Sequence, residues 1–184
     1  MADGTDNSVS AAGLAEMAAQ AGRKAGGLPP VDQWNPPYCG EMDLEIRADG
    51  SWWHEGTPIG RPAMVRLFST ILKREGDRHY LVTPVEKVGI RVEDAPFLAI
   101  DADFADDAIT FSTNVGDTVI AGPDHAIRVA TGKDGEPRPY VHVRGGMEAL
   151  IDRKTFYRLA ERAEAGPDGR MGVVSGGRFF ALET

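Results

Sequence analysis

The stretch from Leu81 to Phe97, LVTPVEKVGIRVEDAPF, has the alternating pattern of a half-buried β-strand with a proline near each end. A period of two places Val88 and Ile90 on one face together with Glu86, while Lys87 points to the other face. A carboxylate aligned with apolar side chains is predicted to be partly buried. Glu86 should therefore be paired with a cation, hydrogen-bonded or protonated, because an unpaired buried charge is costly.

Two acidic residues, Glu93 and Asp94, end this predicted strand. Pro96 favours extended geometry at the residue before it, so both acids are predicted to lie where the strand turns. Two interpretations fit the stretch. It is either a strand with a structural ion pair followed by a turn, or one wall of a ligand site.

Length, charge and cysteine content exclude several classes of protein. A chain of 184 residues can bury about 70% of its unfolded surface without disulfides, and its one cysteine, Cys39, fits a reducing cytoplasm, where we expect the protein to be located. The four histidines lack metal-binding spacing, so no metal and no cofactor are expected. The net charge of -8 argues against binding an extended nucleic-acid duplex, and no apolar run is long enough to cross a membrane.

Composition suggests three parts. Residues 1–30 are rich in alanine, glycine and serine, and we expect a mobile or loosely packed arm with one short helix between Val9 and Gln20. Residues 31–83 are predicted to form an N-terminal domain of a hairpin and a helix. Residues 84–184 are predicted to form a C-terminal β-rich domain with one helix.

A short pattern occurs twice. At a constant offset of 92 residues, I-x-R-x-x-[MF]-x-R-L begins at Ile59 and again at Ile151, each time after a strand and a glycine turn. In the first copy Pro62 is suited to open a helix, which we expect to run to about Lys73 or Arg74. Short strands separated by turns fill the rest of the chain. We therefore predict an α+β fold, mostly antiparallel, with a duplicated hairpin-plus-helix unit.

Arg61 is predicted to be the N-cap of that helix, where Ser, Thr, Asp or Asn is preferred and the helix dipole disfavours a cation. Exposed N–H groups together with a guanidinium could hold a phosphate or a carboxylate. Alternatively, Arg61 pairs with Glu86 or Asp94 in the core. Arg153 repeats the arrangement in the second copy, but there Asp152 supplies a conventional cap.

The sequence resembles the bacterial domain of unknown function family 1285. The segments that carry the resemblance are CGEMDLEIRADGSWWHEGTPIGRPAMVRLFSTIL and LVTPVEKVGIRVEDAPFLAID, and the likeness covers most of residues 34–184. The resemblance implies a duplicated core whose C-terminal half is superficially like a pleckstrin-homology barrel. It also implies that a small polar ligand, of a nucleotide-like kind, binds between the two halves in a signalling role.

We therefore expect a non-catalytic module that holds a small polar or anionic ligand between its halves. Arg61 and Lys87 are the predicted anion contacts, and Glu86 and Asp94 are predicted to orient them. Trp34 could stack on a base of the ligand, although aromatic residues in such segments are more often part of a core.

Two other functions stay open. Glu86 or Asp94 could act as the general base of a hydrolase or transferase in the same cleft, although the sequence carries no established catalytic signature and no catalytic residue is assigned. A protein-interaction scaffold would use an exposed hairpin edge, or Trp52 and Trp53, to anchor a protein partner.

Overall fold

The computed structural model describes residues 9–184, which form two compact units. The first unit consists of the described residues up to Glu45 together with Trp52–Arg91, and the second consists of Ile46–Ser51 and Val92–Thr184. Each unit contains one six-stranded sheet, and helices are few. The architecture is therefore α+β with a repeated two-unit arrangement. The main passage into the second unit follows Arg91, whereas composition predicts it at residue 84.

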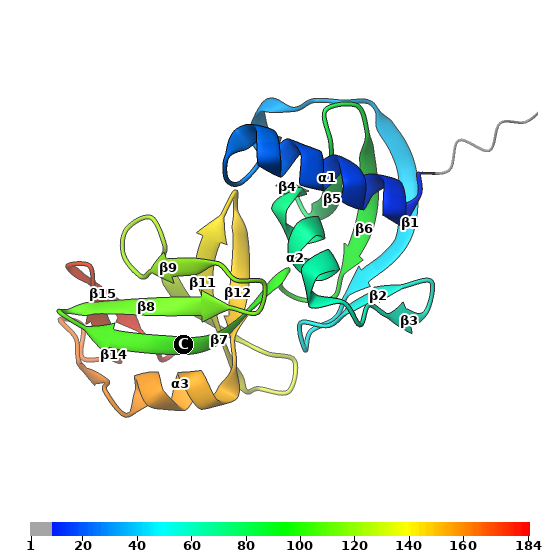
Figure 1. Cartoon of the computed structure of the whole chain (residues 1–184). Coiled ribbons are helices and arrows are strands. Elements are labelled where there is room, and N and C mark those ends of the chain that lie inside the picture. Colours follow the sequence, from blue (N-terminus) through cyan, green and yellow to red (C-terminus); the bar gives the residue numbers. More distant parts are fainter. Residues whose placement is uncertain (1–8) are drawn as a thin grey trace, which may run out of the picture. The chain divides into compact units, whose positions relative to one another are not determined.

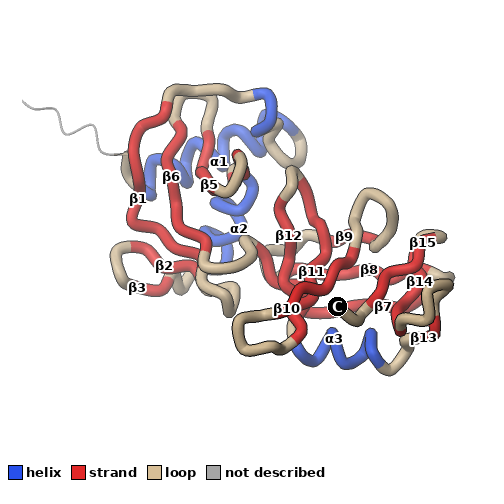
Figure 2. The backbone as a smooth tube through the Cα atoms, turned by 180° about the vertical axis from the view of Figure 1, so that it is seen from behind, coloured by secondary structure: helices blue, strands red, loops and turns tan. Residues whose placement is uncertain are grey.

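The first unit places two helices against one sheet. Its elements are α1 (Ala11–Ala25), the 3-10 helix η1 (Val31–Gln33), β1 (Tyr38–Ile46), β2 (Trp52–His54), β3 (Thr57–Pro58), α2 (Pro62–Thr70), β4 (Leu72–Glu75), β5 (Arg78–Val82) and β6 (Lys87–Val92). The strand order is β3-β2-β1-β6-β5-β4. Helices α1 and α2 lie on the same face of this sheet, in front of it in Figure 1 and behind it in Figure 2.

The alternation of β1 explains which face the helices cover. Met42, Leu44 and Ile46 are buried, whereas Glu41 and Asp43 between them are exposed. Because successive side chains of a strand point to opposite faces, the apolar set lies under the helices and the acidic set lies on the other face. That second face carries the charged residues considered below.

Helix α1 is docked onto the unit. The Ser10 hydroxyl caps it by accepting a hydrogen bond from Gly13 N at 3.0 Å, and Gly26 ends it in the left-handed conformation. Leu14 and Ala18, one turn apart on one face, are fully buried, and α1 packs against α2. The expectation of a loosely packed arm is therefore wrong for this helix, because a narrow stripe of one large and one small side chain is enough to dock it. The first eight residues of the predicted arm lie outside the described residues.

Helix α2 is shorter than predicted. It begins at Pro62, as expected, but ends at Thr70 instead of near Lys73 or Arg74. The Thr70 hydroxyl donates back to a main-chain carbonyl of the preceding turn at 2.6 Å, and the residues that follow pair with β5 as strand β4. Gly76, with φ of 59°, lies in the turn between β4 and β5 and does not end the helix. Pairing with β5 has overridden the helical periodicity of this segment.

The second unit is built on a sheet with the order β10-β11-β12-β7-β8-β9. Its elements are β7 (Phe97–Ala105), β8 (Ala108–Thr113), β9 (Thr118–Ile120), β10 (Ile127–Thr131), β11 (Pro137–Arg144), β12 (Met147–Ile151), α3 (Arg153–Ala160), β13 (Glu164–Ala165), β14 (Met171–Ser175) and β15 (Arg178–Ala181). Strands β12 and β7 pair in parallel, and the other neighbours in this sheet pair antiparallel. The last three strands form a separate antiparallel sheet, β13-β14-β15.

A strand leads directly into a helix in both units, from β3 to α2 and from β12 to α3. Arg61 is the N-cap of α2 and makes no cap hydrogen bond. In the second unit Asp152 is the N-cap, its carboxylate accepting from Thr155 N at 2.9 Å, and Arg153 is the first helical residue. The two copies thus differ in helix register, and only the first has a cation at its cap. None of the described helices has both the length and the apolarity needed to span a membrane.

Candidate functional site

The face of the first sheet that points away from α1 and α2 carries a compact group of charged side chains. Strand register places Lys73 of β4 opposite Tyr80 of β5, and Tyr80 opposite Gly89 of β6. The period of two places Glu75 and Lys87 on the same face as these residues. We call Lys73, Glu75, Tyr80 and Lys87 the lysine cluster.

Glu75 joins two lysines that come from different strands. Lys87 Nζ donates a hydrogen bond to Glu75 Oε2 at 3.0 Å, and Lys73 Nζ lies 3.4 Å from Glu75 Oε1. Lys73 Nζ also donates to the main-chain oxygen of Trp34 at 3.2 Å, and Lys87 Nζ lies 4.9 Å from the centre of the Tyr80 ring. The two lysine side chains are only 15% and 16% exposed, which is low for a residue type that usually extends into water.

The charges of the lysine cluster do not balance. The hydrogen bond from Lys87, supported by the nearby charge of Lys73, lowers the pKa of Glu75 from its usual value even though burial opposes the shift. One carboxylate therefore faces two ammonium groups, each with three N–H donors. Excess positive charge in a partly desolvated position is costly, and a bound anion would relieve that cost.

A second ion pair borders the lysine cluster. Arg78 donates to the carboxylate of Glu41, which also accepts from Tyr38 Oη at 2.5 Å. The Glu41 carboxylate lies so close over Gly89 that a Cβ at this position would overlap it. The Arg78 guanidinium lies 5.2 Å from the centre of the Tyr80 ring, where cation–π attraction holds it over the ring. Tyr80 is therefore covered by cations from two strands, Arg78 of β5 and Lys87 of β6.

Two of the predicted ligand contacts, Lys87 and Trp34, are connected through this group. Lys73 provides the link, because its ammonium contacts both the Trp34 carbonyl and the Glu75 carboxylate that Lys87 binds. Trp34 contributes its main-chain oxygen, and its side chain is half-buried. The loop that holds Trp34 is thus fixed against β4.

Arg61 and Glu86 do not join the lysine cluster through any contact between described residues. Glu86 is half-buried, as the alternation predicts, but its carboxylate has no ion pair or hydrogen bond with a described residue. The prediction of a cation or hydrogen-bond partner is therefore wrong, because Glu86 lies in the turn before β6 where water still reaches it. The alternative of a protonated carboxyl group stays a prediction. Arg61 is exposed and forms no ion pair with any described residue, so the alternative of a Glu86 partner is also wrong.

Asp94 belongs to the second unit and is hydrogen-bonded there. Its carboxylate accepts from Tyr140 Oη at 2.7 Å and from Arg138 at 3.2 Å. Burial, together with the hydrogen bond to Asp94, raises the pKa of Tyr140. This is the arrangement expected of a structural hydrogen-bonded pair at the end of a strand.

The two consecutive tryptophans do not form an exposed patch. Trp52 is 2% exposed, and its ring stacks on Phe68 with the ring centres 6.3 Å apart. Trp53, on the other side of the strand, is half-buried. Trp52 is therefore excluded as an anchor for a protein partner, because it is a core residue packed against α2.

Sequence reasoning did not identify three members of the lysine cluster. Lys73 and Glu75 share a face on a strand but not on a helix, because the side-chain period is two on a strand and 3.6 on a helix. The prediction of a helix around Lys73 therefore did not place Glu75 beside it. The available signal was the turn at Gly76, flanked on both sides by alternating residues, which is typical of a hairpin. The alternating segments are LKRE and RHYLV.

The lysine cluster is suited to anions and not to metals. Its lysines present N–H donors, whereas a metal requires several carboxylate, imidazole or thiolate ligands. Within residues 9–184, no group of three or more histidine, cysteine, aspartate or glutamate side chains is placed to hold a metal ion.

Two family models together match most of the residues of the two units. The model described as "Domain of unknown function (DUF1285), N-terminal domain" matches residues 29–95. The model described as "Protein of unknown function (DUF1285), C-terminal domain" matches residues 96–182. No curated protein matches the chain.

Two solved structures are similar to the chain. A DUF1285 family protein from Silicibacter pomeroyi DSS-3 is 56% identical with a TM-score of 0.86, covering 94% of this chain and 95% of that one. A DUF1285 family protein from Shewanella baltica OS155 is 28% identical with a TM-score of 0.52, covering 64% of this chain and 90% of that one. Sequence and fold agree, and the chain belongs to the DUF1285 family of proteins of unknown function.

Proposed function

We propose that the chain is a non-catalytic binding module for a small polar anion and that the anion binds at the lysine cluster. The observation that carries the proposal is the shared carboxylate: Lys73 and Lys87, with side chains 15% and 16% exposed, both contact Glu75. Two ammonium groups held in place by one carboxylate form a preorganised site with unused N–H donors.

The chemistry around the two lysines favours an anion with several oxygen atoms. Tyr80 Oη has no hydrogen-bond partner among the described residues and can donate to a ligand oxygen. The Trp34 side chain is half-buried beside the carbonyl that Lys73 binds, and it offers an aromatic surface for a base. Together these groups support a phosphate-bearing, nucleotide-like ligand, which is also what the resemblance to the family implies.

Other parts of the proposal rest on the sequence. Arg61 stays a predicted further anion contact, with Glu86 and Asp94 as predicted orienting carboxylates. The resemblance supports a signalling role and a pleckstrin-homology-like C-terminal half, and the antiparallel strand pairs of both units support a mostly antiparallel fold. The composition supports a location in the cytoplasm.

A ligand titration with matched lysine and arginine variants tests the site. All three tryptophans, Trp34, Trp52 and Trp53, belong to the first unit, so their fluorescence reports on this unit alone. Wild type is titrated at low ionic strength with inorganic phosphate, nucleotides, cyclic nucleotides and sugar phosphates. Lys87→Met keeps most of the aliphatic stem and removes the charge. We expect it to weaken binding at least tenfold.

Arg91→Met is the matched control, because Arg91 lies on the same strand and face as Lys87 but is 59% exposed and paired with Asp43 at 2.7 Å. It should leave the affinity within twofold of wild type. Arg61→Ala tests whether the N-cap of α2 contributes to the affinity for the same ligand. Equal losses in Lys87→Met and Arg91→Met, or no response of wild type to any compound, would overturn the lysine cluster as the site.

The enzyme alternative is separated by incubating the protein with the same compounds and measuring product. A hydrolase or transferase that used Glu86 or Asp94 as its base would turn over at least one compound and would lose that activity in Glu86→Gln or Asp94→Asn. A binding module leaves every compound intact. Asp94 is the weaker candidate, because Tyr140 and Arg138 already donate to its carboxylate.

A further inference from the structure

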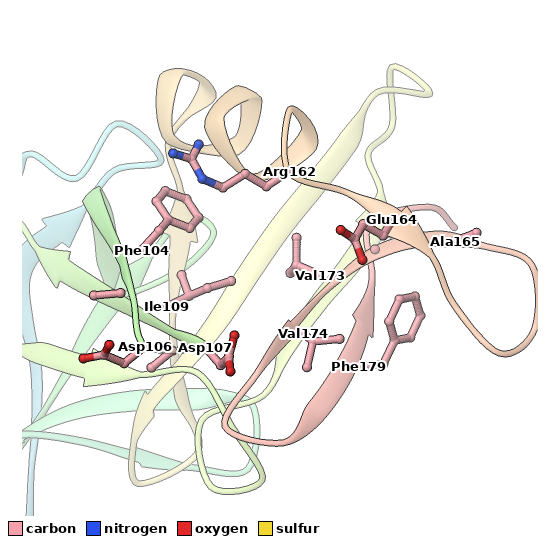
Figure 3. A pocket seen from close by; sticks show the side chains of 13 residues that line it. Phe104, Asp106, Asp107, Ile109, Arg162, Glu164, Ala165, Val173, Val174 and Phe179 are labelled. Carbon is pink, nitrogen blue, oxygen red and sulfur yellow. The ribbon is translucent and has the colours of Figure 1, made fainter.

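A cleft of about 350 Å³ opens in the second unit, between the β7–β8 turn, the end of α3 and the sheet β13-β14-β15. This volume falls within the range of about 300–1,000 Å³ typical of small-molecule sites. Figure 3 shows Asp107 and Glu164 reaching toward the cleft from opposite sides, with Val173 and Val174 between them. The cleft therefore has an apolar floor with a carboxylate at each side.

The carboxylates of the cleft are not neutralised by the protein. Among the described residues, the side chains of Asp106, Asp107 and Glu164 have neither an ion pair nor a hydrogen bond. Within the described part of the chain, Arg162 is the one cation that lines the cleft. Its guanidinium lies 4.0 Å from the centre of the Phe104 ring and donates to a main-chain oxygen of α3 at 3.3 Å. Asp107 and Glu164, the two carboxylates that reach toward the cleft, against one guanidinium leave it with a net negative charge.

The floor and one wall of the cleft are fixed in place. The Phe179 ring lies directly over Gly166 and Gly172, and a Cβ at Gly172 would come within 2.5 Å of Phe179 Cζ. The two glycines thus seat the ring as a rigid aromatic wall. Val174 is 56% exposed and presents apolar surface to the cleft, whereas its neighbour Val173 is 5% exposed and points to the other face of β14.

From this arrangement we propose that the cleft of the second unit binds an aliphatic diamine, with one ammonium group at Asp107, the other at Glu164, and the methylene chain over Val174. Two carboxylates on opposite sides match the two charges of such a ligand, and the apolar floor matches its alkyl chain. The Phe179 wall adds a surface that attracts cations. This site is independent of the anion site in the first unit.

A diamine series tests the proposal in the full chain. Isothermal titration at low ionic strength compares 1,3-diaminopropane, putrescine and cadaverine with butylamine, which has the chain of putrescine but only one ammonium group. We expect one diamine to bind at least tenfold more tightly than butylamine, with a clear dependence on chain length. Asp107→Asn and Glu164→Gln should each weaken the binding of that diamine at least tenfold. Each should change the affinity for butylamine less.

Asp106→Asn is the matched control. Asp106 neighbours Asp107 in the same turn and has a similar left-handed backbone that asparagine also tolerates, but its carboxylate points away from Val173 and Val174 (Figure 3). It should bind diamines like wild type. Val174→Lys, at an exposed position, places a competing ammonium in the cleft and should abolish binding.

Three results would overturn the diamine proposal. If butylamine binds as tightly as the diamines, the occupant carries a single ammonium group, as a lysine side chain of a partner protein would. If Asp106→Asn and Asp107→Asn weaken binding equally, the diamines only screen the acidic surface of this chain, whose net charge is -8. No measurable binding of any diamine at millimolar concentration also excludes the site.

Discussion

Glu75 and Lys87 form an ion pair with an Oε2–Nζ distance of 3.0 Å although their strands, β4 and β6, are separated by β5. Neighbouring strands lie about 4.8 Å apart, so the two backbones are on the order of 10 Å from each other and both side chains must extend across β5. They meet over Tyr80, which is only 8% exposed. The ion pair therefore contributes to the burial of this tyrosine.

Glu75→Gln is expected to destabilise the first unit but to tighten anion binding. The variant should lose roughly 1 kcal/mol of unfolding free energy, a modest amount because Glu75 is 36% exposed and its ion pairs are screened by water. Phosphate should bind several-fold more tightly, since the lysine cluster then carries one more positive charge. Urea unfolding followed by tryptophan fluorescence measures the first effect, and phosphate titration measures the second.

Asp43→Asn is the control for the Glu75 variant, because it removes an acid from the same face but from the pair with Arg91. It should change phosphate affinity little. Acid titration adds a further check, since the pKa of Glu75 is lowered from 4.5. The stabilising contribution of Glu75 is therefore present above pH 4.5 and is lost as the pH falls further. Weaker phosphate binding in Glu75→Gln would show that the placement of the two lysines by Glu75 matters more for binding than the added positive charge.

His79→Phe is expected to reduce the acid sensitivity of the first unit. Burial, reinforced by the positive charge of Arg74, lowers the pKa of His79 from 6.5 to about 4, and its buried Nε2 has no hydrogen-bond partner among the described residues. Between these two pH values the unfolded chain binds a proton that the folded chain does not, so stability falls as the pH decreases from 6.5 toward 4. At about 1.4 kcal/mol per pKa unit the loss is at most about 3.5 kcal/mol.

The measurement is the unfolding free energy of the first unit at several pH values, again from tryptophan fluorescence. Wild type should lose stability below pH 6.5, and His79→Phe should retain more of it. Above pH 6.5 the two proteins should show the same pH dependence, which serves as the internal control. An identical slope below pH 6.5 would show that His79 is protonated in the folded state at the same pH as in the unfolded chain.

Local patterns predicted much of this fold. Strand β8 (Ala108–Thr113) is one of the short strands expected between turns, because turn-forming residues bound an alternating segment on both sides. The alternation around Lys87 also correctly predicted which side chains of β6 are buried. The helix prediction is wrong after Thr70 because the residues that follow pair with β5. The periodicity of one segment carries no information about pairing with a later strand.

The candidate site was less predictable than the fold. Lys87 could be singled out from its own strand, but its partner Glu75 is two strands away, and the lateral order β6-β5-β4 is not encoded in any short segment. The reasoning about Glu86 failed only for its partner. Glu86 is half-buried as the alternation predicts, but it precedes the first residue of β6, where water still reaches its carboxylate.

Leu14→Ala is expected to undock α1. Leu14 is fully buried, and removing most of its side chain should cost about 2–4 kcal/mol of the stability of the first unit. Gln20→Ala, at an exposed position of the same helix, is the control and should have little effect. Protease digestion provides an independent measurement, because an undocked helix is cut rapidly. Equal digestion rates for both variants would mean that α1 contributes little to the unit.

Gly172→Ala and Gly89→Ala should differ strongly in cost, although both replace a strand glycine with a close neighbour. At Gly172 the added Cβ overlaps the main-chain oxygen of Phe180 in β15, which moves only if the strand moves, so a loss of about 2–3 kcal/mol or more is expected. At Gly89 the added Cβ meets only the carboxylate of Glu41, the flexible end of an exposed side chain, and the cost should stay below about 1 kcal/mol. Urea unfolding followed by circular dichroism measures both, and a similar loss in the two variants would show that β15 yields as easily as a surface side chain does.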